Sequence, residues 1–171
     1  MMAYKLRTEP YHLKLLTYLN NRMKLSESET QYLYSLKKGY EGEVTFDTLT
    51  EKLRSECYIL NDLLLEVNNT EFQIDSTLIY QAKLFLCEIK NFDGEHSYDP
   101  KSLKFYKMPS LEINNPLHQL DRKENLLRQF LKARGMTIPI EPYLVFIDPE
   151  FTLFQAPIHP SSSFLHNSLS L

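Results

Sequence analysis

The sequence predicts an α/β domain in which helices flank a central mixed β-sheet. Apolar residues first recur at helical spacing, change to the pattern of strands from about residue 58, and return to helical spacing after the strands. The chain has 171 residues, of which 43% are hydrophobic. This length and composition suit one globular domain rather than two domains or a disordered chain.

Two helices are expected at the N-terminal end, and together they form a predicted helical hairpin. The first helix begins after Pro10 and continues to about Met23, with leucines and tyrosines recurring on one face. The second helix begins at Ser26, because Glu29 three residues later completes a capping-box pattern. It is expected to stop at Gly39, since glycine commonly ends helices.

The middle of the chain carries the pattern of a third helix and then of a sheet. The helix is expected over residues 42–56. Apolar runs separated by Asn and Gly turns then predict three main strands, over residues 58–65, 72–80 and 83–90. A short strand after Gly94 and another over residues 103–106 are expected to pair with each other.

The last third of the chain is expected to close the domain. An Asn-Pro pair at residues 115–116 is typical of a helix start, and this helix should end at Gly135. Two strands are expected over residues 143–147 and 151–154. Residues 156–171 are rich in Ser, Pro and His and are expected to form a frayed tail.

Composition excludes several classes of protein. Cys57 and Cys87 are too few for a disulfide framework, and no Cys/His cluster has the spacing of zinc ligands. The first residues lack the apolar core of a signal peptide. The sequence also has no apolar stretch of about eighteen residues, the length needed to span a bilayer. A cytoplasmic protein without a membrane partner is therefore expected.

A pair of carboxylates on neighbouring strands is the strongest chemical signal. Strand alternation places Glu88 and Lys90 on the same face of the strand over residues 83–90. Asp75 interrupts the apolar strand that precedes it. A hairpin of these two strands would bring Asp75 close to Glu88.

Two adjacent carboxylates repel each other unless they share a proton or bind a cation. Hard oxygen ligands of this kind suit Mg²⁺, which retains several water molecules. A bound ion would polarise a phosphoryl oxygen and lower the pKa of a water molecule, and Lys90 would position that water or neutralise charge on the phosphorus. The pattern favours metal-assisted hydrolysis of a phosphodiester.

Four sequence blocks resemble those of a known family. Asp75 followed by Glu88, Ile89 and Lys90 resembles the D…ExK signature of the PD-(D/E)XK nuclease superfamily. The surrounding blocks occur in the order and spacing of its nuclease-related domain (NERD) family, at residues 39–43, 72–75, 88–94 and 115–119. The resemblance covers residues 39–135. The helical stretch before Gly39 is similar to the N-terminal extension of stand-alone bacterial members.

The resemblance implies an αβββαβ core and a role for five residues. Glu43 would reach the metal ion from the first core helix, directly or through water. Asp75 and Glu88 would be the main metal ligands, Lys90 would be the catalytic lysine, and Gln119 would orient the nucleic-acid backbone or the ligands. Mg²⁺ or Mn²⁺ would be the cofactor.

The chain departs from the family pattern at three places. Ser76 stands where members often have His after the motif Asp, and residues 81–83 replace a Gly that many members have before the ExK strand. Lys123 stands four residues after Gln119, where some relatives in the superfamily have Tyr. These departures leave the implied ligands unchanged and bear on the handling of the substrate.

The charge distribution adds a second line of evidence. The net charge is −3, but residues 96–134 carry eight Lys or Arg and four Asp or Glu. A basic flank beside an acidic metal site suits a phosphate-backbone substrate. The candidate nucleic-acid contacts are Lys101, Lys104, Lys107, Arg122 and Lys123.

Each of these residues also has an ordinary structural explanation. Glu88 and Lys90 would suit a solvated strand end, and Glu43 would suit the first turn of a helix. Asp75 would suit a turn, Gln119 a solvated helix face, and the basic residues another such face.

We therefore expect a metal-dependent nuclease that hydrolyses phosphodiester bonds of nucleic acid, with DNA as the favoured substrate. A homodimer is one open option for its oligomeric state. The expected organisation is a helical extension (1–38), a NERD-like core (39–155) and a tail (156–171). The alternative is a nucleic-acid-binding or protein-interaction module on the same fold with little or no activity.

Overall fold

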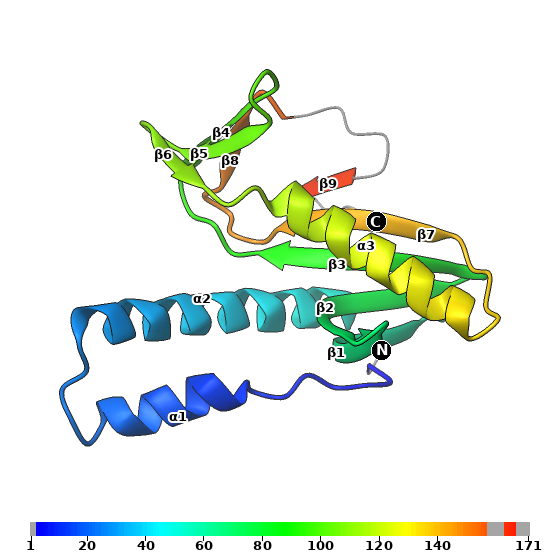
Figure 1. Cartoon of the computed structure of the whole chain (residues 1–171), viewed down its shortest axis with the longest axis horizontal. Coiled ribbons are helices and arrows are strands. Elements are labelled where there is room, and N and C mark those ends of the chain that lie inside the picture. Colours follow the sequence, from blue (N-terminus) through cyan, green and yellow to red (C-terminus); the bar gives the residue numbers. More distant parts are fainter. Residues whose placement is uncertain (1–2, 157–162, 167–171) are drawn as a thin grey trace.

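The computed structural model describes residues 3–156 and 163–166, and it has the predicted α/β fold. Helices α1 (Tyr11–Asn20) and α2 (Glu27–Thr50) form the predicted hairpin beside the sheet (Figure 1). The elements that follow are β1 (Tyr58–Val67), β2 (Thr70–Tyr80), β3 (Lys83–Lys90), β4 (Glu95–Asp99), β5 (Lys104–Lys107), β6 (Leu111–Ile113), α3 (Pro116–Ala133), β7 (Ile140–Phe146), β8 (Thr152–Phe154) and β9 (Ser163–His166).

The strands of the described chain form two sheets. The larger sheet has the order β1-β2-β3-β7-β9, in which β1, β2 and β3 are antiparallel neighbours and β7 runs parallel to β3. It is the predicted mixed sheet, with α2 on one side and α3 on the other (Figure 1). The smaller sheet, β6-β5-β4-β8, is an addition to the predicted architecture, although the pairing of β4 with β5 was expected.

The predicted stop at Gly39 is wrong, because α2 continues through Gly39 and Gly42 to Thr50. A glycine inside a helix costs about 1 kcal/mol relative to alanine. Packing beyond this point outweighs that cost, since Phe46 is buried against the sheet and Gly42 lets the helix approach Asn91. The separate helix expected over residues 42–56 is therefore wrong: residues 42–50 are the second half of α2, and residues 51–56 lie beyond its end at Thr50.

The starts of the two long helices, and the end of α3, agree with their sequence signals. Ser26 and Glu29 form both hydrogen bonds of the capping box, and the Asn115 side chain accepts from the Leu117 N–H at 2.9 Å. Gly135 follows the end of α3 with a φ of +69°, a conformation that favours glycine. Local sequence thus determines where these helices start and where α3 ends.

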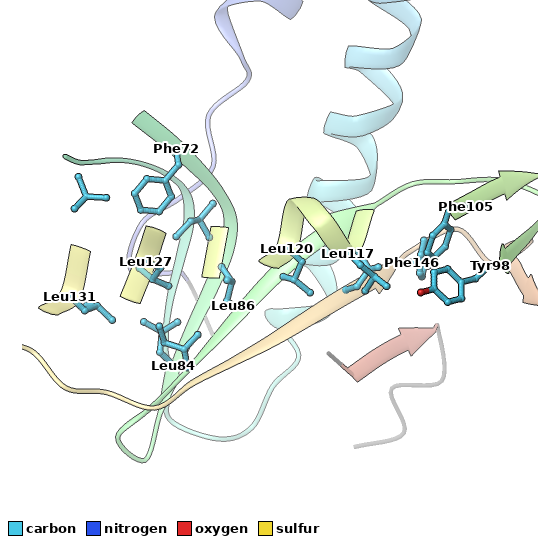
Figure 2. Packing of buried hydrophobic residues seen from close by; sticks show 14 of the residues in the cluster. Phe72, Leu84, Leu86, Tyr98, Phe105, Leu117, Leu120, Leu127, Leu131 and Phe146 are labelled. Carbon is cyan, nitrogen blue, oxygen red and sulfur yellow. The ribbon is translucent and has the colours of Figure 1, made fainter. Parts of the chain in front are cut away.

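Helix α3 packs over the larger sheet through a stripe of leucines. Its buried apolar residues include Leu117, Leu120, Leu127 and Leu131, and they contact side chains of β2, β3 and β7. The same cluster continues to Tyr98 and Phe105 of the smaller sheet (Figure 2). Burying each leucine contributes about 1.5–3 kcal/mol, so one apolar core holds both sheets to α3.

The strand alternation predicted for β3 is confirmed. Leu84 and Leu86 face the α3 side, whereas Cys87 and Ile89 pack on the α2 side with Phe46. Strand β3 is therefore covered by α3 on one face and by α2 on the other, and its last residues lie between these two helices. None of the helices in the described part of the chain combines the length and apolar character needed to cross a membrane.

The prediction of a frayed tail over residues 156–171 is wrong for residues 163–166, which form strand β9. This strand pairs in parallel with β7, from Tyr143 opposite Ser163 to Phe146 opposite His166. The backbone groups on that side of β7 need partners, and an added strand satisfies them. Residues 157–162 and 167–171 of the expected tail lie outside the described residues.

Candidate active site

A cavity of about 800 Å³ lies between α2 and α3, where β3 ends and the chain turns toward β4. All five predicted catalytic residues line it: Glu43, Asp75, Glu88, Lys90 and Gln119. They come from four separate elements, α2, β2, β3 and α3. The fold therefore brings together the residues that the sequence motifs singled out.

Side chains of β3 and α3 face each other in two matched contacts. Lys90 Nζ donates to Gln119 Oε1 at 2.7 Å, and Glu88 Oε2 forms an ion pair with Lys123 Nζ. Glu88 and Lys90 are two residues apart on a strand, which is about 6.6 Å. Gln119 and Lys123 are four residues apart on a helix, which is about 6 Å, so the two pairs of side chains match in spacing. Lys90 Nζ also donates to Glu88 Oε1 at 2.8 Å.

Asp75 approaches Glu88 at the point where β2 and β3 separate. The ladder between the two strands ends at Ser76 opposite Cys87, and Asp75 is the next residue of β2. Its Oδ2 accepts a hydrogen bond from the Ile89 N–H at 2.9 Å, and its Oδ1 accepts from Lys123 Nζ at 2.9 Å. Asp75 and Glu88 thus hold one ammonium group between them.

This cluster of Asp75, Glu88 and Lys123 is largely withdrawn from solvent. The exposed fractions of the three side chains are 11%, 2% and 17%, in that order. Burial alone lowers the pKa of Lys123, but attraction from Asp75 and Glu88, together with the hydrogen bond that Lys123 donates to Asp75, outweighs it, so the pKa lies above its ordinary value. Lys123 is therefore a stable cation in this position.

Glu43 reaches the same cavity from α2, but its closest partner is a cation other than Lys123. Arg7 Nη1 donates to Glu43 Oε2 at 2.7 Å. Burial and the nearby negative charge of Asp75 raise the pKa of Glu43 to about 7, although Arg7 acts in the opposite direction. Glu43 thus holds a proton more readily than an ordinary glutamate.

Arg7 is a residue of this site that sequence reasoning missed. Its side chain is 3% exposed and also binds Asp47 through two hydrogen bonds of 2.9 and 3.0 Å. Its Nη2 donates to the backbone oxygen of Asp75 at 3.0 Å. A backbone bridge between Lys5 and Leu60 holds this segment beside β1. No motif marks Arg7, because its position depends on that long-range pairing.

The donor atoms fit a hard divalent cation in part. In the described residues, no three His, Cys, Asp or Glu side chains are grouped so that they could hold a metal ion. Asp75 and Glu88 nevertheless direct two carboxylate oxygens at one cation, and oxygen ligands of this kind suit Mg²⁺ and Mn²⁺. Asp75 and Glu88 would hold the ion, and Glu43 would join them directly or through water.

A second ionic contact crosses the rim of the cavity. The carboxylate of Asp93 pairs with Lys38 of α2 and with Lys107 of β5, the latter at 3.2 Å. Hydrogen bonds from these two lysines hold the pKa of Asp93 well below its usual range. Lys38 lines the cavity but was missed, because the expected stop at Gly39 placed it at a helix end.

The predicted nucleic-acid contacts divide into two groups. Lys107, Arg122 and Lys123 line the cavity. Lys104 instead pairs with Glu112 at 2.8 Å, and Lys101 follows Asp99, whose carboxylate accepts from the Lys101 N–H. These last two lysines are not part of the cavity lining.

A comparison with known protein families identifies the family of this chain. The family model described as nuclease-related domain (NERD) matches residues 38–147, which is more than half of the chain. The chain therefore belongs to the NERD family. No curated protein and no solved structure matches the chain.

Proposed function

We propose that this protein is a metal-dependent nuclease that hydrolyses phosphodiester bonds in nucleic acid, with DNA as the first substrate to test. One observation carries the proposal: Asp75 and Glu88 converge on a single cationic group beside Lys90. Membership of a nuclease-related family supports it. The rim of basic residues supports an anionic substrate.

Each polar residue of the cavity has a proposed task. Asp75 and Glu88 hold Mg²⁺ or Mn²⁺, and Glu43 completes the ligands directly or through water. When bound, the ion supplies Lewis acidity toward a phosphoryl oxygen and lowers the pKa of a water molecule. Lys90 neutralises the charge that develops on the phosphoryl oxygens, and Gln119 fixes the direction of the Lys90 side chain.

The basic residues of the rim would bind the phosphates on either side of the scissile bond. Lys107 and Arg122 approach from β5 and α3, and Lys38 approaches from α2. Contacts of this kind fix the position of the strand without reading its sequence. A nuclease without sequence preference is the simplest outcome of such a site.

The test compares cleavage of DNA with Mg²⁺ or Mn²⁺ and with EDTA. Glu88→Gln and Lys90→Met should each lower the rate by roughly a hundredfold or more, because each removes charge at the reacting centre. Glu112→Gln and Lys104→Met are matched controls, since this ion pair lies outside the cavity lining. Cleavage that survives both site variants would come from a contaminant and would contradict the proposal.

A second function is favoured by the same ion pairs. The carboxylates of Asp75 and Glu88 are already neutralised by Lys90 and Lys123, which suits a module that binds nucleic acid or protein with little turnover. Nucleic-acid binding without metal-dependent cleavage would support that function. A cytoplasmic location and a homodimer stay predictions.

A further inference from the structure

Lys123 occupies the place between the two carboxylates proposed as metal ligands. Its Nζ lies 2.9 Å from Asp75 Oδ1 and also contacts Glu88 Oε2. The other oxygen of each carboxylate is used elsewhere. Asp75 Oδ2 accepts from the Ile89 N–H, and Glu88 Oε1 accepts from Lys90. The two remaining oxygens therefore share one cation, and that cation is a side chain of the protein.

Lys123 leaves Glu88 Oε2 without a well-formed hydrogen bond. Glu88 Oε2 is fully buried, and among the described residues it accepts no hydrogen bond of ordinary geometry, although it forms the ion pair with Lys123. A buried carboxylate oxygen ordinarily needs such a bond. A metal ion imposes no donor hydrogen direction on its ligands, so this position suits a spherical cation at least as well as an ammonium group.

We propose that Lys123 is an internal competitor of the divalent metal ion: its ammonium occupies the cation position and must leave before Asp75 and Glu88 hold Mg²⁺ or Mn²⁺. This inference rests on the proposed function, because it concerns the same two ligands. It predicts a site that loads only at high metal concentration. The displaced ammonium stays on a residue that lines the cavity, where phosphates of a substrate would attract it.

The competition follows from charge. The carboxylates of Asp75 and Glu88 are balanced by the ammonium groups of Lys90 and Lys123. Adding a divalent ion without moving Lys123 would place two cations within one partly buried site, where repulsion is stronger than in water. A residue with a purely structural role would not oppose metal binding, and its loss would not tighten it.

The experiment measures Mn²⁺ affinity by electron paramagnetic resonance of the free ion, without nucleic acid. Lys123→Met should bind Mn²⁺ at least about tenfold more tightly than the natural chain, because it removes one competing charge. Lys123→Arg keeps the charge and should stay close to the natural chain. Lys132→Met is the matched control on an exposed turn of the same helix and should leave the affinity unchanged.

Thermal stability provides the accompanying measurement. Without metal, Lys123→Met leaves two carboxylates facing each other, so its Tm should fall, and Mn²⁺ should restore it. An Mn²⁺ affinity of Lys123→Met equal to or weaker than that of the natural chain would overturn the inference.

A second measurement uses the natural chain and does not depend on whether the variant folds. Amine-reactive labelling followed by mass spectrometry should modify Lys123 slowly without metal and several-fold faster at saturating Mn²⁺. Labelling that Mn²⁺ leaves unchanged would overturn the inference while leaving the metal site intact. If neither the natural chain nor Lys123→Met binds Mn²⁺, the proposed function itself fails.

Discussion

Arg7 Nη1 and Glu43 Oε2 lie 2.7 Å apart, and this pair joins the N-terminal segment to the helix that carries one predicted metal ligand. The same guanidinium also binds Asp47 and the backbone of Asp75. Arg7 therefore connects α2 with β2 next to two residues of the cavity lining, Glu43 and Asp75. Residues 3–7 are part of the site's support even though they precede the family match.

Replacing Arg7 should destabilise the protein strongly. Arg7→Met leaves Glu43 and Asp47 without their guanidinium partner, and breaking a buried pair typically costs about 3 kcal/mol or more. Urea unfolding at neutral pH measures the loss. Arg22→Met is the control at an exposed position and should change stability by less than about 0.5 kcal/mol. Equal stability of the two variants would contradict the role of Arg7.

Stability should depend on pH through Glu43. Its pKa is raised from 4.5 to about 7 in the folded protein, so folding takes up a proton between these values. The stabilising contribution is therefore complete below about pH 4.5 and is lost as the pH rises through about 7.

The pH prediction is tested with Glu43→Gln in EDTA. Relative to this variant, the natural chain should lose up to about 3 kcal/mol of unfolding free energy between pH 4.5 and pH 8, because each pKa unit corresponds to about 1.4 kcal/mol. Urea unfolding at several pH values gives the difference. A difference that stays constant over this range would show that Glu43 has an ordinary pKa.

Two glycines of α2 should respond oppositely to alanine. A Cβ at Gly42 would lie 2.6 Å from Asn91 Cβ, whereas a Cβ at Gly39 would meet nothing within 4 Å. Gly39→Ala should stabilise the helix by up to about 1 kcal/mol through helix propensity. Gly42→Ala gains the same propensity but should be destabilising by about 1–2 kcal/mol, because the helix must move away from β3. Chemical denaturation measures both, and equal effects would rule out the close approach.

Nucleic-acid binding should depend on the basic residues of the cavity. In a Glu88→Gln background that prevents cleavage, Lys107→Gln and Arg122→Gln should each weaken binding of a labelled oligonucleotide. Each should also reduce the slope of log affinity against log salt by about 1. Lys104→Gln should have little effect, since Lys104 pairs with Glu112 outside the cavity lining. A uniform loss for all three variants would place the binding surface elsewhere.

The larger sheet and its carboxylate pair were predictable because the evidence is local. Strand period alone places Glu88 and Lys90 on one face, and a short hairpin links their strand to that of Asp75. The resemblance to the NERD family added Glu43 and Gln119, which come from elements distant in the sequence. All five residues line one cavity, while their roles in catalysis stay predictions.

What the sequence did not predict depends on contacts between distant segments. The stop at Gly39 was wrong because packing of Phe46 and Gly42 against the sheet outweighs local helix propensity. Arg7 has no local signal at all, since its place follows from the bridge between Lys5 and β1. Strand β9 likewise becomes apparent only beside β7.

The continuity of α2 also affects how a fragment of this protein should be chosen. The family match begins at residue 38, inside the helix, and a fragment limited to residues 38–147 would lack the capping box at Ser26. It would also lack Arg7, so Glu43 and Asp47 would lose their guanidinium partner. The segment that matches the family model is therefore shorter than the segment that should be kept in a fragment meant to preserve the cavity.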